Sequence, residues 1–212
     1  VGVLTRLRKF EMYQSNLSSM NDFTFFLREG LYHITDIRGY DHILFVVALC
    51  LPYLPGDWKK VLLLVTAFTI GHSVTLALSI YNKILLSSNW IEFLIPVTIM
   101  ITALQNVWVK KFDVEKIKWR YAAALVFGLI HGMGFSNYLR SMMGKNEQIV
   151  TQLLAFNIGL ELGQLLIVLA VMLLGFIFVP VFKTPRREWI LFISGGIFSI
   201  ALVMALERLA EL

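Results

Sequence analysis

Six apolar stretches follow one another along the chain, separated by short polar segments, and most are long enough to cross a bilayer. They cover residues 39–54, 61–81, 91–109, 119–139, 149–182 and 189–206. About twenty residues of helix, rising 1.5 Å each, cross a hydrocarbon core of roughly 30 Å. We therefore predict an all-α integral membrane protein, a bundle of about six transmembrane helices with a short outer helix near the N-terminus. The first stretch is the shortest, so we expect it to begin in the preceding polar segment or to lie partly inside the protein.

The composition agrees with one membrane-embedded bundle. Mean hydropathy is +0.72 and charged residues make up 16% of the 212 residues, whereas soluble domains carry about 25% charged residues. We predict that residues 20–212 form a single polytopic membrane domain. Because Met20-Asn21-Asp22 resembles a start, residues 1–19 are expected to be an N-terminal extension with no structural role. The one cysteine, Cys50, excludes a disulfide within the chain.

The basic residues predict an orientation in the membrane rather than a nucleic-acid partner. The net charge is +5, but the basic residues cluster in short segments between the apolar stretches, which is the positive-inside pattern. The denser set, close to helix ends, is expected on the cytoplasmic side: Lys59, Lys60, Lys110, Lys111, Lys116, Lys118, Arg120, Lys183, Arg186 and Arg187. Both termini then lie outside the cytoplasm, and the lipid bilayer is an expected partner.

All four histidines of the chain lie in or beside these apolar stretches. They are His33, His42, His72 and His131. Ionisable groups in a membrane are costly, so they usually face the bundle interior and mark a site. Counting about 1.5 Å per residue from the predicted helix ends puts His72, His131 and Glu161 at middle to outer depth, with Asp41 and His42 somewhat above them. Separate helices are thus expected to bring polar groups to one layer of the membrane.

These side chains form a suitable ligand set for a divalent transition metal, because imidazole and carboxylate groups bind such ions. The predicted metal ligands are His42, His72, His131, Asp41 and Glu161. The residues predicted to line the rim or to hold the ligands are His33, Glu92, Asn157 and Gln164. The simpler alternative is that the histidines only form hydrogen bonds between helices, at about 0.6 kcal/mol each. A glutamate in an apolar span fits that alternative poorly, because it must be neutral, paired or metal-bound.

Four linked motifs, spread over roughly residues 30–205, resemble the HupE/UreJ family of bacterial membrane proteins. The matching segments are His33-Ile34 with residues 39–45, residues 68–76 around His72, residues 131–135, and residues 156–164 around Glu161. The family is associated with hydrogenase and urease, which are nickel enzymes. The resemblance therefore implies a nickel or cobalt permease of the bacterial inner membrane. The charge distribution described above would then place both termini on the periplasmic side. A hydrogenase or urease accessory protein is the other role that the family name implies.

Three functions remain open at this point. The first is a permease for Ni²⁺ or Co²⁺, which would need polar residues that continue toward the cytoplasm; Thr66, Gln105 and Asn106 are a thin series of candidates. The second is a Zn²⁺-dependent intramembrane hydrolase, in which Asp41 or Glu161 would act as general base and Ser73 would assist. The third is an accessory or assembly subunit whose polar cluster is structural. Since no phosphate-binding glycine motif is present, transport would be passive, ion-coupled or driven by a membrane-protein partner, and a homo-oligomer is also open.

Overall fold

A computed structural model describes residues 22–80, 87–108, 114–143 and 149–212, and every element in these ranges is helical. The expected N-terminal extension, residues 1–19, lies outside the described residues. The α-helices are α2 (Asp22–Thr35), α3 (Asp41–Cys50), α4 (Trp58–Ile80), α5 (Ser88–Trp108), α6 (Val114–Met143), α7 (Ile149–Phe176) and α8 (Arg186–Leu209). Short 3₁₀ turns η2 (Ile37–Gly39) and η3 (Pro55–Asp57) and a π-helical turn η4 (Ile177–Val181) join them. The prediction of an all-α protein is confirmed.

Four helical segments of the described chain are long and apolar enough to cross a membrane. They are Pro55–Ser79, Ser88–Trp108, Ile149–Val181 and Arg186–Leu209. Many of their large apolar side chains are exposed, as expected for surfaces that contact lipid rather than water. The helix α3 is apolar but has only 10 residues, which at 1.5 Å each gives about 15 Å, half of a hydrocarbon core. The number of six spans stays a prediction.

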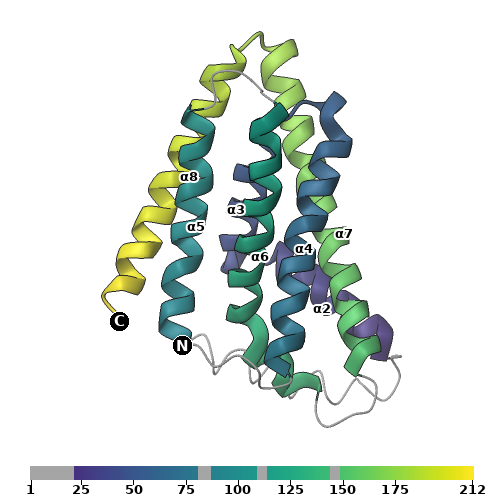
Figure 1. Ribbon diagram of the computed structural model, residues 1–212. Coiled ribbons are helices and arrows are strands. Elements are labelled where there is room, and N and C mark those ends of the chain that lie inside the picture. The colour runs from purple at the N-terminus through teal and green to yellow at the C-terminus, as the bar shows by residue number, and fades with distance from the viewer. Residues whose placement is uncertain (1–21, 81–86, 109–113, 144–148) are drawn as a thin grey trace.

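The long helices pack as close pairs (Figure 1). In the pair α2–α7, a Cβ atom added to Gly159 would overlap the carbonyl oxygen of Leu27, and one added to Gly30 would overlap that of Phe156. In the pair α4–α6, a Cβ added to Gly128 would overlap the carbonyl oxygen of Phe68. Only glycine permits backbones to approach so closely, which is the small-residue packing typical of membrane helices. The third pair, α5–α8, contains no such glycine among the described contacts.

The helical path is interrupted between α2 and α3, and this break in the helix positions the site. Helix α2 is buried along α7 through Phe25, Phe26 and Ile34, while α3 lies in the middle of the bundle (Figure 1). The turn η2 between them begins where the side chain of Asp36 accepts a hydrogen bond from the backbone nitrogen of Arg38, at 3.0 Å. His33 therefore stands in the last turn of α2, and His42 stands in the first turn of α3.

Candidate metal centre

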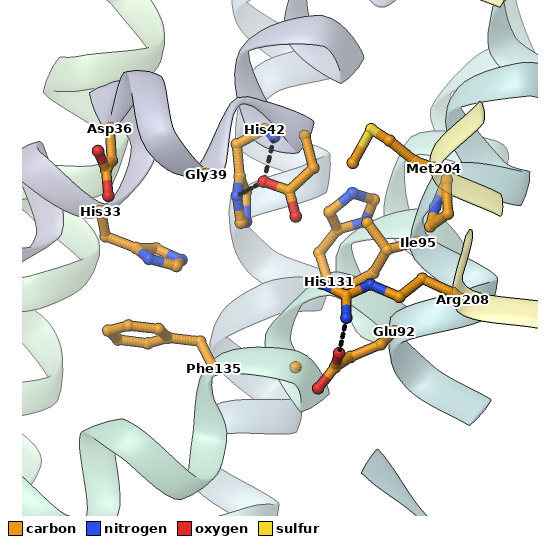
Figure 2. A pocket seen from close by; sticks show the side chains of 13 residues that line it. His33, Asp36, Gly39, His42, Glu92, Ile95, His131, Phe135, Met204 and Arg208 are labelled. Carbon is orange, nitrogen blue, oxygen red and sulfur yellow. Dashed lines mark hydrogen bonds and ion pairs between the residues drawn. The ribbon is translucent and has the colours of Figure 1, made fainter. Parts of the chain in front are cut away.

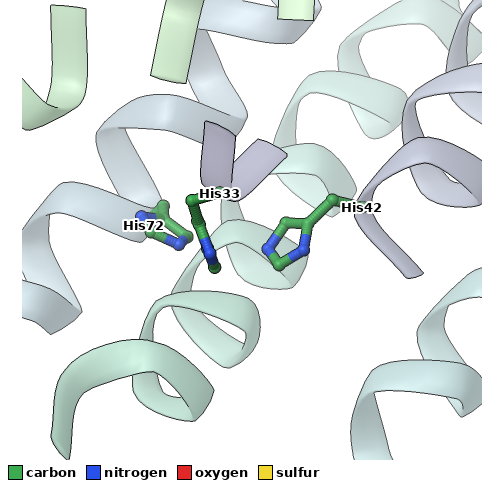
Figure 3. A group of neighbouring side chains, drawn as sticks. All are labelled: His33, His42 and His72. Atoms are coloured by element: carbon green, nitrogen blue, oxygen red, sulfur yellow. The ribbon is translucent and has the colours of Figure 1, made fainter. Parts of the chain in front are cut away.

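Three histidines from three helices converge beside the break (Figure 3). His33 of α2, His42 of α3 and His72 of α4 each offer one ring nitrogen, and these three atoms lie within 4.8 Å of one another. Two nitrogens bound to one zinc-like ion at about 2.1 Å each lie at most about 4.2 Å apart. Small rotations of the side chains would therefore bring all three onto a single ion.

Asp41 holds the ring of His42. Its Oδ1 atom accepts hydrogen bonds from the backbone nitrogen of His42, at 2.8 Å, and from the Nδ1 atom of the ring, at 2.9 Å. The opposite nitrogen, Nε2, is buried and has no hydrogen-bond partner among the described residues. A carboxylate that binds one imidazole nitrogen fixes the tautomer and leaves the other nitrogen available for a metal, which is the arrangement found behind many metal-binding histidines.

His131 of α6 lies next to His42 and extends this group. Its ring centroid lies 5.2 Å from that of His42. The Nδ1 atom is 2.8 Å from the carbonyl oxygen of Phe127, so it donates to that oxygen, and the buried Nε2 atom has no partner among the described residues. Both ring nitrogens of His72, which is fully buried, likewise have none. A buried polar atom without a partner costs about 1–3 kcal/mol, and a cation bound to the unprotonated nitrogen of a ring would remove that nitrogen's share of the cost.

A cavity of about 490 Å³ opens beside the histidines (Figure 2). One part of its wall holds three of the histidines and Asp41, and the opposite part holds an ion pair between Glu92 of α5 and Arg208 of α8, with Nη1 and Oε2 3.0 Å apart. The residues that line it are His33, Asp36, Gly39, Asp41, His42, Glu92, Ile95, Pro96, His131, Gly134, Phe135, Met204 and Arg208. Three carboxylates against one guanidinium give the wall a net negative charge, which favours an incoming cation.

The acidic residue of α7 lies apart from the histidines. Glu161 does not line the cavity; its Oε1 atom accepts a hydrogen bond from the hydroxyl of Thr66, at 2.7 Å. Thr66 precedes His72 by six residues on α4, which is about 9 Å of helix rise toward the other end of the bundle. Between these two levels, the hydroxyl of Thr69 donates to Oε1 of Gln164, at 2.7 Å. The sequence analysis grouped Glu161 with the histidines, whereas the structure separates them by about two helical turns.

The other residues that the sequence predicted for the site do not share one location. Glu92 lies at the cavity wall, as expected for a rim residue. Ser73 donates to the backbone oxygen of Thr69, at 2.6 Å, a common use of a helical serine. The Oδ1 atom of Asn157 is buried without a partner among the described residues.

The structure also adds residues to the site. His33, assigned to the rim from the sequence, is one of the three converging histidines. Asp36 and Arg208 line the cavity and were not singled out as site residues. Asp36 could have been found from the sequence, because an acid between two histidines in a polar segment is a candidate ligand. Arg208 offered no such signal, because its helix is far from the others along the chain.

Comparison with known families agrees with the motifs. A family model described as "HupE / UreJ protein" matches residues 8–208, nearly the whole chain, which confirms the resemblance. No curated protein and no solved structure matches the chain.

Proposed function

Because the chain belongs to the HupE/UreJ family, we propose that it is a permease that carries a divalent transition-metal ion, Ni²⁺ or Co²⁺, across the bacterial inner membrane. In this proposal the loops rich in lysine and arginine face the cytoplasm, both termini face the periplasm, and the cavity beside the histidines opens outward. The metal ion is the substrate. The lipid bilayer and the ion are the only partners that the proposal requires.

The observation that carries the proposal is a series of polar side chains that continues inward from the histidines between α4 and α7. His72 is followed by the pair Thr69–Gln164 and then by the pair Thr66–Glu161. Gln164 is fully buried and Glu161 is partly buried, and among the described residues no cationic side chain lies within ion-pair distance of Glu161. A carboxylate at this depth without a countercharge is costly, and a passing cation would stabilise it.

The donor groups suit stepwise transfer. His33, His42 and His72 capture the ion at the cavity, with Asp41 orienting the second of them, and His131 offers a further nitrogen. Imidazole nitrogens suit nickel and cobalt. The oxygens of Gln164 and Glu161 then receive the ion further inward. Ligands spread over two levels bind the ion more weakly than one closed cage, so the ion can leave as well as enter.

The test is metal uptake by the purified protein in proteoliposomes. We expect Ni²⁺ or Co²⁺ to accumulate with the wild type, and uptake to fall at least about tenfold in both His72→Ala and Glu161→Gln. The matched control is Glu188→Gln, which removes an exposed carboxylate from the start of α8 and should transport normally. His72→Ala should also lose metal binding, whereas Glu161→Gln should retain binding at the histidines. Full uptake in Glu161→Gln would show that the Glu161 carboxylate, and with it the polar series between α4 and α7, plays no part in transport.

A Zn²⁺-dependent hydrolase is the second candidate, because the cavity of about 490 Å³ has the size of an organic-ligand site, roughly 300–1,000 Å³. Three histidines could hold Zn²⁺, which would activate a water, and Asp41 is the carboxylate nearest to them. The hydrolase hypothesis also used Glu161 and Ser73. Glu161 accepts a hydrogen bond from Thr66, and Ser73 donates one to a backbone oxygen, so neither side chain contacts the histidines through these bonds. Stoichiometric zinc that survives chelator washing, together with an absence of metal flux, would favour this candidate. If the protein neither retains zinc nor carries metal across the membrane, an accessory subunit would be favoured.

A further inference from the structure

One aromatic side chain of the cavity wall lies against a metal-binding histidine. Phe135 of α6 lines the cavity together with His33 of α2, and their ring centroids are 3.7 Å apart, with the ring planes inclined by 34° (Figure 2). Aromatic pairs usually have centroids about 4.5–7 Å apart, so these two rings are in direct contact. Phe135 follows His131 by four residues and therefore stands one turn further along the same face of α6.

A second phenylalanine supports Phe135. The ring of Phe156 on α7 is stacked on that of Phe135, with centroids 5.3 Å apart and planes at 16°. The same ring lies 5.7 Å from that of His33 and is nearly parallel to that of His72, at 6.4 Å and 15°. Phe156 is fully buried in the apolar core, so it gives Phe135 a rigid support. Two of the three converging histidines therefore lie beside one stack of phenylalanine rings.

The position of His33 explains why its ring benefits from such packing. His33 stands in the last turn of α2, directly before the helix is interrupted, and its imidazole rotates about two side-chain bonds. Only orientations that point a ring nitrogen toward His42 and His72 can bind a shared ion. The apparent affinity falls with the fraction of molecules in the competent state. A flat ring packed against the imidazole restricts its rotation and so raises that fraction.

We propose that Phe135 is a positioning residue of the metal centre, which holds the ring of His33 in the orientation that binds the ion. This inference rests on the metal binding that the proposed function requires. The contact should strengthen when the ion binds, because a metal-bound imidazole carries part of the ion's positive charge and the face of a phenyl ring is negative. Phe135 therefore favours the metal-bound state without contributing a ligand atom.

The experiment compares the Co²⁺ affinity of the purified wild type, Phe135→Leu and Phe135→Tyr, measured by calorimetry. Leucine keeps an apolar side chain at the cavity wall but has no flat ring, so the affinity of Phe135→Leu should fall about threefold to tenfold, the usual strength of an aromatic pair. Phe135→Tyr keeps the ring and should bind nearly as the wild type does. Phe198→Leu is the matched control, because Phe198 is also a partly buried phenylalanine, and among the described residues no ring contact joins it to a histidine.

A double variant identifies the ring through which Phe135 acts. In a His33→Ala background that still binds Co²⁺, adding Phe135→Leu should cause no further loss, because the ring that it holds is gone. An undiminished loss in that background would overturn the inference. Wild-type affinity in Phe135→Leu, or an equal loss in Phe135→Tyr or in Phe198→Leu, would also overturn it.

The failure of this inference can be distinguished from the failure of the permease proposal. Co²⁺ affinities that follow the expected order in a protein without metal uptake would reject the permease and keep the role of Phe135. Metal uptake by the wild type, combined with wild-type Co²⁺ affinity in Phe135→Leu, would reject that role alone.

Discussion

Replacing Asp41 with asparagine should weaken metal binding without changing the shape of the site. The carboxylate Oδ1 accepts from both the backbone nitrogen and the ring Nδ1 of His42, at 2.8 and 2.9 Å. An asparagine oxygen can still accept these bonds, but the negative charge that raises the basicity of the opposite ring nitrogen is lost. Removing such a supporting partner typically lowers metal affinity about 10–100-fold, or about 1.4–2.8 kcal/mol at 1.4 kcal/mol for each factor of ten.

Asp36 provides the matched control. It also lines the cavity and carries one negative charge, but its side chain accepts from the backbone nitrogen of Arg38 and is more exposed than Asp41. Asp36→Asn should therefore lower affinity only a few-fold, through weaker attraction of the cation in a well-solvated position. The assay is titration of the detergent-solubilised variants with Co²⁺, followed by its visible absorption and by calorimetry. Equal losses in the two variants, or wild-type affinity in Asp41→Asn, would refute the claim that the Asp41–His42 contact supports a ligand.

Three further predictions test the packing, the inward pathway and the topology. Gly159→Leu should prevent α2 from packing on α7 and destabilise the protein by about 3 kcal/mol, the upper end of the usual cost of overpacking. Gly195→Leu, where a Cβ meets nothing within 4 Å, should be close to neutral. Thermal unfolding in detergent measures both, and equal melting temperatures would contradict the packing argument. Thr66→Val removes the hydrogen-bond donor to Glu161 on α7 and should alter the uptake rate while leaving Co²⁺ affinity at the histidines unchanged. A changed affinity would instead indicate that the Thr66–Glu161 pair and the histidines belong to one binding site. In a background without Cys50, a cysteine at Ser88 should react with an impermeant reagent added outside and one at Lys59 should not, and the reverse pattern would invert the orientation.

Much of the fold class and of the site's depth could be predicted from the sequence. The apolar stretches have lengths that only a membrane requires, so they determine helices and their order. Position along the membrane normal follows from counting residues at a fixed rise, which is why His42, His72 and His131 were expected in one layer and do lie together. The linked motifs were enough to identify the family, because four matches in the same order are far more specific than one.

What the sequence could not determine is how each helix is rotated and which helix lies beside it. Glu161 was expected at the level of the histidines, but it lies beside Thr66, about 9 Å of helix rise further inward, because counting from a predicted helix end does not show how far α7 is shifted along α4. His33 lies beside His42 and His72 on a helix whose glycine contacts with α7 place it close to the bundle. Arg120 resembles an ordinary loop residue in the sequence and is buried beside Asn106 in the structure. Depth is a local property, set by each segment's own hydrophobic length, whereas rotation and neighbours depend on side-chain packing between segments distant in the chain, so only the tertiary structure decides them.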